Sequence, residues 1–299
     1  YMFNSCSKLI TLNLSNFKTS AVKNMDNMFR ICSTLISLDL SNFDTSQVTD
    51  MQCMFRNCSN LISLDLSNFD TSQVENMLYI FFGCSNLESI DVSNFNTSQV
   101  ENMGHMFDYC SSLISIDVSN FNTSKVTNMN WMFSHCRKLI SINVTSFDTS
   151  NTKNMLGIFN DCPSLISIDV SNFNTSQITN MWSMFNNCKN LTSLNLYNFN
   201  TSQVTNMNIM FDGCSKLEYI NLQNFNEDKL DTYTNIFNLV PDNIVICINN
   251  DIINNNNSKL LKEIKNKTCY SIDCSNDWET KKKEIMNEPI NGCKCKLNN

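Results

Sequence analysis

Cysteine is the residue whose number and spacing first suggest chemistry in this sequence. Of 15 cysteines in 299 residues, nine recur at intervals of 26. Equivalent positions of stacked coils lie about 4.8 Å apart, which is close enough for disulfides. Nine members cannot all pair, and cysteine is among the most buried residue types, so we interpret the column as buried free thiols. This structural column comprises Cys6, Cys32, Cys58, Cys84, Cys110, Cys136, Cys162, Cys188 and Cys214. Cys53 lies off the column and is the predicted reactive or free thiol.

Aspartate forms a second column in the same repeat, at Asp39, Asp65, Asp91, Asp117 and Asp169. Carboxylates in a row on one face are candidate ligands for Ca²⁺, because this ion takes about six to eight oxygens. The alternative is a hydrated surface with screened charges, although like charges opposite one another on neighbouring strands are mildly destabilising. We take the hydrated surface as the simpler interpretation.

The two histidines, His105 and His135, occupy different columns. A zinc site or a Ser-His-Asp triad needs partners that loops bring together, and a regular coil lacks such loops. The HExxH, P-loop and GxGxxG motifs are absent, and only five glycines occur. We therefore expect no enzymatic activity and no cofactor.

These columns belong to a repeat of 26 residues that extends from the start of the chain to about residue 230. Within it, Leu38 and Leu40 alternate with polar residues, which predicts a short strand with one buried face. Thr45 or Ser46 then begins an apolar pattern, ending at Phe55, that predicts a short helix. The expected fold is an α/β repeat solenoid of the leucine-rich-repeat type. It would have about nine coils, a parallel β-strand ladder and one short helix per 26-residue coil.

The repeat resembles that of the BspA-like leucine-rich-repeat surface proteins of bacteria and protists, whose pattern reads approximately MFxxCxxLxxLDLSxFDTSxVxxMxxMF. The match covers about residues 1 to 230. The resemblance implies an extracellular, non-enzymatic solenoid used in adhesion or host interaction. It carries no functional residue over to this chain.

Positions that vary between repeats are the predicted partner-binding positions, because residues common to every coil are needed for stacking. The candidates flank the inward methionines or lie in the last coils: Leu78, Tyr79, Trp131, Trp182, Ile209, Tyr197 and Tyr219. Exposed together, such side chains would form a partner surface. The alternative is that they pack over neighbouring coils.

The repeat ends near Phe237, which predicts a solenoid at 1–237 and a C-terminal cap with a cysteine-containing tail at 238–299. A strand is expected at 243–248 and a helix at 258–267. The tail cysteines fit no zinc spacing, and a secreted context favours disulfides, whose pairing stays open. These disulfide candidates are Cys247, Cys269, Cys274, Cys293 and Cys295. Glycosylation candidates in Asn-x-Ser/Thr sequons are Asn96, Asn122, Asn174, Asn200, Asn256 and Asn266.

The net charge of −7 argues against nucleic acid as a partner. The chain begins in the last part of a repeat, so we expect a leader and an N-terminal cap before it and a membrane anchor beyond residue 299. The sequence thus predicts an extracellular or cell-surface protein that acts in adhesion or protein-protein recognition, with a protein or glycan ligand. The alternatives are a structural subunit that self-assembles into a coat or filament, and a carbohydrate-binding module.

Overall fold

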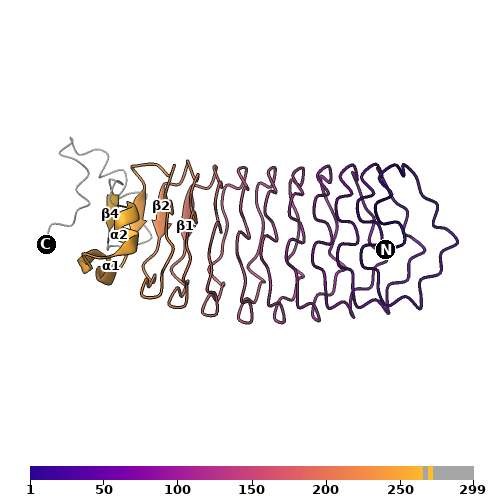
Figure 1. Cartoon of the computed structure of the whole chain (residues 1–299), viewed down its shortest axis with the longest axis horizontal. Helices are drawn as coiled ribbons and strands as arrows, with labels where there is room; N and C mark the ends of the chain where they lie inside the picture. The colour runs from indigo at the N-terminus through magenta and orange to yellow at the C-terminus, as the bar shows by residue number, and fades with distance from the viewer. Residues whose placement is uncertain (265–268, 272–299) are drawn as a thin grey trace.

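The computed structural model describes residues 1–264 and 269–271. These residues form an elongated stack of similar coils, with the N-terminus near one end and two short helices near the other (Figure 1). One hydrophobic core, from Leu14 to Ile264, runs the length of the stack. The predicted repeat solenoid is therefore confirmed.

Phenylalanine supplies the axis of this core. From Phe3 to Phe237, one phenylalanine of each coil stacks on its equivalent in the next, with ring centroids 5.4 to 6.0 Å apart. The predicted alternation is also present, since Leu38 and Leu40 are buried and Asp39 is exposed. A single coil would leave its ring open on both sides, so each coil depends on its neighbours.

The predicted helix in each coil is wrong. Segments such as residues 52–57 form consecutive turns, and within the described residues the helices lie beyond the coils. Two residues in each such segment are left-handed, for example Asn27 (φ 55°) and Ile31 (φ 59°). An α-helix of L-residues cannot contain this conformation. The helix-like spacing of apolar residues therefore reflects which side chains face the core, not helical backbone.

Hydrogen bonding in the turn segment alternates between two directions. The N–H of Met28 donates within its own coil to the carbonyl of Met25 (3.2 Å), whereas the N–H of Phe29 donates to Met54 of the next coil (2.9 Å). Ile31 likewise donates to Arg56 of the next coil (2.7 Å). The bonds that join the coils therefore run through the segment that was predicted to be helical.

Regular strands are fewer than predicted. Within the described residues they form one parallel sheet, in the order β1 (Ser193–Asn195), β2 (Tyr219–Asn221), β3 (Val245–Cys247) and β4 (Cys269–Ser271). Side-chain amides also join neighbouring coils, at a position just after the segments equivalent to these strands. Asn68 Nδ2, for example, donates to the carbonyls of Leu40 (3.0 Å) and Phe43 (2.7 Å) in the preceding coil.

Threonine, predicted to cap the helices, instead joins neighbouring coils. Thr71 Oγ1 donates to the carbonyl of Asn96 (3.0 Å) and accepts from the N–H of the same residue (2.8 Å). Thr71 is fully buried. A buried hydroxyl that satisfies two backbone groups of the adjacent coil fixes the register between them.

The C-terminal end of the stack is covered by α1 (Asn250–Asn254) and α2 (Lys259–Ile264). Ser258 caps α2 as predicted, because its Oγ accepts from the N–H of Leu261 (2.9 Å). Glu227 of the last coil accepts from the N–H groups of Lys259 and Leu260 (both 2.9 Å), which ties the helix to the stack. The strand predicted at 243–248 contains β3. The end of the predicted helix, after residue 264, lies outside the described residues.

No helix within residues 1–264 or 269–271 has the length and apolar character needed to cross a membrane.

Candidate recognition surface

The predicted partner-binding residues do not form one exposed ridge. In the last coils, Tyr219 is buried whereas Tyr197 is 47% exposed. The candidates that flank the methionines are all half-buried: Leu78, Tyr79, Trp131, Trp182 and Ile209. Most of this set therefore packs partly against the surface of the stack.

Several of these side chains stack from coil to coil. The ring of Tyr79 lies on that of His105 (centroids 4.4 Å apart), and His105 faces Trp131 (6.3 Å). Trp131 then meets Trp182 edge to face (5.4 Å). Gly157 occupies the coil between the two tryptophans, and its lack of a side chain leaves room for the indole of Trp131. The aromatic variation between repeats thus makes a packed row.

A second group of variable residues lies beside this row. The guanidinium of Arg56 lies over the rings of Tyr79 (4.8 Å) and Phe82 (5.0 Å). Phe82 contacts Tyr109 (5.5 Å), which stacks on His135 (3.8 Å). Sequence reasoning missed Arg56, Phe82 and Tyr109, although their positions also vary between repeats. The predicted positions lay in the columns next to the methionines and in the last coils.

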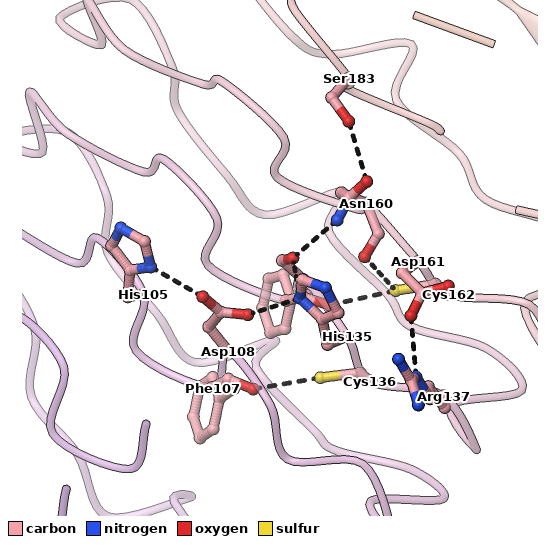
Figure 2. A network of polar contacts seen from close by, with 12 residues as sticks. His105, Phe107, Asp108, His135, Cys136, Arg137, Asn160, Asp161, Cys162 and Ser183 are labelled. Carbon is pink, nitrogen blue, oxygen red and sulfur yellow. Dashed lines mark hydrogen bonds and ion pairs between the residues drawn. The ribbon is translucent and has the colours of Figure 1, made fainter. Parts of the chain in front are cut away.

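Asp108 is buried between two histidines (Figure 2). Its carboxylate oxygens lie 2.8 Å from His105 Nδ1 and 3.1 Å from His135 Nδ1. A buried carboxylate is costly unless it has hydrogen-bond partners, and the two imidazoles supply them. The polar row continues through Asn160 Nδ2, which donates to Ser134 Oγ (3.2 Å), and Ser183 Oγ, which donates to Asn160 Oδ1 (2.8 Å).

Ser134, His135 and Asp108 together have the composition of a catalytic triad, which was not expected in a regular coil. Their geometry is different, because Ser134 Oγ (2.7 Å) and Asp108 Oδ1 (3.1 Å) both contact Nδ1 of His135. In a triad, the serine and the carboxylate contact opposite ring nitrogens. Ser134 is also fully buried. These three residues therefore form a structural network.

A hollow of about 330 Å³ opens beside Tyr109. Tyr109 is 44% exposed, and Arg137 is held in place by Asp161, with 2.8 Å between Nε and Oδ2. The hollow combines aromatic rings, a guanidinium and polar groups, which suits a ligand with both an apolar and a polar part. We call it the aromatic hollow; it is lined by Asn57, Phe82, Gly83, Ser85, Tyr109, Ser111 and Arg137.

The predicted cysteine column consists of free thiols, all buried except the half-buried Cys6. Cys136 Sγ donates to the carbonyl of Phe107 (3.2 Å), and the same bond recurs along the column (Figure 2). Burial raises the pKa of the Cys32 thiol to about 11 and that of Cys214 to about 12. Cys53 is also buried, and this burial raises the pKa of its thiol, so its surroundings do not activate it.

Of the predicted disulfide cysteines, Cys247 in β3 is disulfide-bonded. The side chains of the other four, Cys269, Cys274, Cys293 and Cys295, lie outside the described residues. The glycosylation candidates Asn96, Asn122, Asn174, Asn200 and Asn256 are exposed, whereas Asn266 lies outside the described residues.

Each member of the aspartate column stabilises a local turn. Asp39 Oδ1 accepts from the N–H of Ser41 (2.9 Å), and the hydroxyl and N–H of Ser41 hold the pKa of Asp39 below its ordinary value. Asn143 makes the same turn with Thr145 (3.1 Å), so the turn does not require a charge. Within residues 1–264 and 269–271, no group of three or more His, Cys, Asp or Glu residues is arranged to hold a metal ion.

A row of exposed isoleucines was not predicted. Its members are 43% to 62% exposed and share one repeat position: Ile10, Ile36, Ile62, Ile114, Ile140 and Ile166. The signal was present, since each follows the first buried leucine of the repeat directly.

A family model described as "Mycoplasma protein of unknown function, DUF285" matches residues 1–63, 60–168 and 158–266. Among solved structures, the chain is similar to a leucine-rich repeat protein from Bacteroides ovatus, with 15% identity, a TM-score of 0.34, and coverage of 88% of this chain and 74% of that chain. A leucine rich cell surface protein from Faecalibacterium prausnitzii has 17% identity and a TM-score of 0.28, with coverage of 70% and 75%. The functional domain of InlJ from Listeria monocytogenes, which includes a cysteine ladder, has 14% identity and a TM-score of 0.24, with coverage of 80% and 52%. A comparison with curated proteins finds no match.

Proposed function

We propose that this chain, which belongs to the family described as Mycoplasma protein of unknown function, DUF285, is a non-enzymatic recognition protein of the cell surface or extracellular space. The predicted resemblance to BspA-like leucine-rich-repeat proteins is confirmed by the family match, which recurs along residues 1–266. The resemblance supports the proposed location and a role in adhesion or protein-protein recognition.

The aromatic hollow is the observation that carries this proposal. Most side chains of the stack serve its own packing, but Tyr109 and Arg137 line a concavity and remain accessible. Aromatic and arginine side chains are the types most enriched among the residues that dominate binding energy at interfaces. The absence of triad geometry around His135 supports the non-enzymatic part of the proposal.

Panning a random peptide display library against the whole protein tests the proposal. Selected peptides are then measured on the double variant Tyr109→Asn/Arg137→Ser. The replacements already occur at the same repeat positions, in Asn187 and Ser85, so the coils keep their fold. We expect the double variant to bind the selected peptides at least about tenfold more weakly.

The matched control is Tyr197→Ser, which removes another exposed tyrosine and introduces the residue found at Ser171. It should bind the selected peptides as the wild type does. Equal binding by all three proteins would exclude the hollow as the recognition site.

A glycan ligand is the second candidate, because the hollow pairs aromatic rings with hydroxyl and amide groups that could contact a sugar. A glycan array probed with the wild type and the Tyr109→Asn/Arg137→Ser variant separates it from a peptide ligand.

Self-assembly into a coat or filament predicts a sedimentation coefficient that rises with protein concentration. A concentration-independent monomer counts against it.

A further inference from the structure

The isoleucine row is an apolar feature that the fold itself leaves uncovered. Neighbouring members are joined through the backbone, since the N–H of Ile62 donates to the carbonyl of Ile36 (3.1 Å) and that of Ile166 to Ile140 (3.1 Å). The row therefore follows the axis of the stack with one side chain per coil. About half of each side chain is nevertheless exposed. Contiguous exposed apolar surface of this kind marks interaction sites.

The coil does not require isoleucine at this position. Thr192 occupies it in a later coil and is exposed in the same way, and Glu88 occupies it in an earlier one. The backbone hydrogen bond between coils is kept when this residue changes. The N–H of Ile114 donates to the carbonyl of Glu88 (3.2 Å), as the N–H groups of other members do to the carbonyl of an isoleucine. Stacking alone thus does not explain the isoleucines.

The aspartate column runs parallel to this row. Asp39 follows Ile36 by three positions and Asp65 follows Ile62 likewise, which places the two rows about 10 Å apart along extended chain. The residues between them on the surface are serines such as Ser37, which is exposed. The coils that carry Ile36, Ile62 and Ile114 therefore present an apolar, a neutral polar and an anionic side chain in the same order.

The charge in this region is negative over four consecutive coils. Hydrogen bonds from Ser41 and Ser67 lower the pKa values of Asp39 and Asp65, so both carboxylates remain charged well into the acidic range. Glu88 adds a further carboxylate within the isoleucine row itself. Between Ile36 and Asp117 the one lysine or arginine of the sequence is Arg56, whose guanidinium lies over the rings of Tyr79 and Phe82.

We propose that this surface, the Ile/Asp strip, binds a basic amphipathic helix of a partner protein. The strip comprises Ile36, Ile62, Glu88 and Ile114 with Asp39, Asp65, Asp91 and Asp117. The helix lies along the axis of the stack, with its apolar face on the isoleucines and its lysines or arginines on the carboxylates. The proposal goes beyond the aromatic hollow, since it uses different residues and a different ligand.

Geometry supports a helix as the occupant. One turn of an α-helix rises about 5.4 Å, close to the spacing of about 4.8 Å between coils, so successive turns meet successive isoleucines over a few coils. A second copy of this chain fits less well, because it would bring one row of carboxylates against another. Charge complementarity with a basic partner removes that repulsion and also favours rapid association.

The test uses a short fluorescent peptide of leucine and lysine in which the leucines recur at i, i+3, i+4 and i+7. Binding to the whole protein is followed by fluorescence anisotropy at low and high salt. We expect saturable binding that weakens as salt rises. A peptide with glutamate in place of lysine, and one of the same composition with strictly alternating residues, should both bind at least about tenfold more weakly.

Two variants separate the contributions of the strip. Ile36→Thr/Ile62→Thr/Ile114→Thr removes the apolar row with the residue already present at Thr192. Asp39→Asn/Asp65→Asn/Asp91→Asn removes charge with the residue already present at Asn143, which keeps the turn. Each should weaken binding of the helical lysine peptide about tenfold while circular dichroism shows an unchanged fold.

The control changes the same amount of charge elsewhere. Glu75→Thr/Glu101→Thr/Asp148→Asn uses residues found at the same repeat positions, in Thr49 and Asn174. It should bind the helical lysine peptide as the wild type does. If this control and the aspartate variant weakened peptide binding equally, the peptide would be attracted by net charge only, which would overturn the proposal. Undiminished peptide binding by the isoleucine variant would overturn it as well. Neither result depends on the aromatic hollow, so the two proposals can fail separately.

Discussion

The indole of Trp131 occupies the space in which a side chain at Gly157 would lie. A Cβ built on Gly157 would come within 2.3 Å of Trp131 Cε3 and Cζ3. The row of aromatic side chains from Tyr79 to Trp182 therefore depends on the smallest residue at one position.

Replacing Gly157 by alanine should destabilise the protein by about 1 to 3 kcal/mol, because the new Cβ displaces the indole. The left-handed backbone there (φ 59°) adds strain, although Ser183 (φ 61°) shows that the column accepts other residues. Urea unfolding measures the change. In Gly157→Ala/Trp131→Ser the clash is absent, so the double variant should lose less than the sum of the two single changes. Additive losses would contradict the argument.

Replacing Asp108 by alanine should cost about 1 to 3 kcal/mol, because two imidazole nitrogens and a buried network lose their acceptor. The matched control is Asp161→Asn, which removes the charge from the partly exposed pair with Arg137 and should cost about 1 kcal/mol or less. Thermal unfolding of both variants checks the difference. Similar losses would mean that the Asp108 network adds nothing beyond a surface ion pair.

The cysteine column should resist alkylation in the folded protein. Burial raises the pKa of the Cys32 thiol to about 11 and that of Cys214 to about 12, and both side chains are inaccessible. Mass mapping after iodoacetamide treatment near neutral pH should find Cys6 labelled first, because it is the column member that is only half-buried. After denaturation, every column cysteine should react. Labelling of Cys110 as fast as Cys6 would show that the coils open or that the column is misplaced.

The aspartate column should make stability fall in acid. Hydrogen bonds from serine lower the pKa values of Asp39, Asp65 and Asp91 in the folded state. A lowered folded pKa gives stability that is present above the unfolded pKa of about 3.9 and is lost as pH falls through the folded pKa. The melting temperature should therefore drop below about pH 4, and less steeply in Asp39→Asn/Asp65→Asn/Asp91→Asn. Parallel curves for the two proteins would contradict this linkage.

The solenoid and its buried columns were predictable because stacking requires the same residue at the same place in every coil. Cys136 and Phe107 are examples, and their burial followed from their period. The backbone was less predictable, since apolar spacing such as that of Met51 and Met54 is shared by helices and by consecutive turns. The left-handed positions were not predictable, because residues as different as Asn27, Ile31 and Tyr79 occupy them. A glycine at each of these positions would have indicated the conformation.

The candidate surface was harder to predict than the core. Tyr79, His105 and Trp131 stand in one column, so their variation was visible, but their mutual stacking depends on Gly157 in a following coil. The aromatic hollow gathers residues from several columns and coils, which no single repeat position could reveal. The isoleucine row is regular in the sequence. What makes it unusual is that its side chains are exposed, and the sequence alone does not show that.

In the turn segment, an N–H that leaves its coil finds its acceptor 25 residues later, as Phe29 does at Met54. Excision or duplication of a whole repeat would leave that rule intact, whereas insertion of one residue would break every bond across the junction. Unequal recombination between such similar repeats would therefore lengthen or shorten the protein in whole coils without a change of fold. Surface features that span several coils, like the aromatic hollow, would be divided or rebuilt by the same event, so array length and ligand choice can change together.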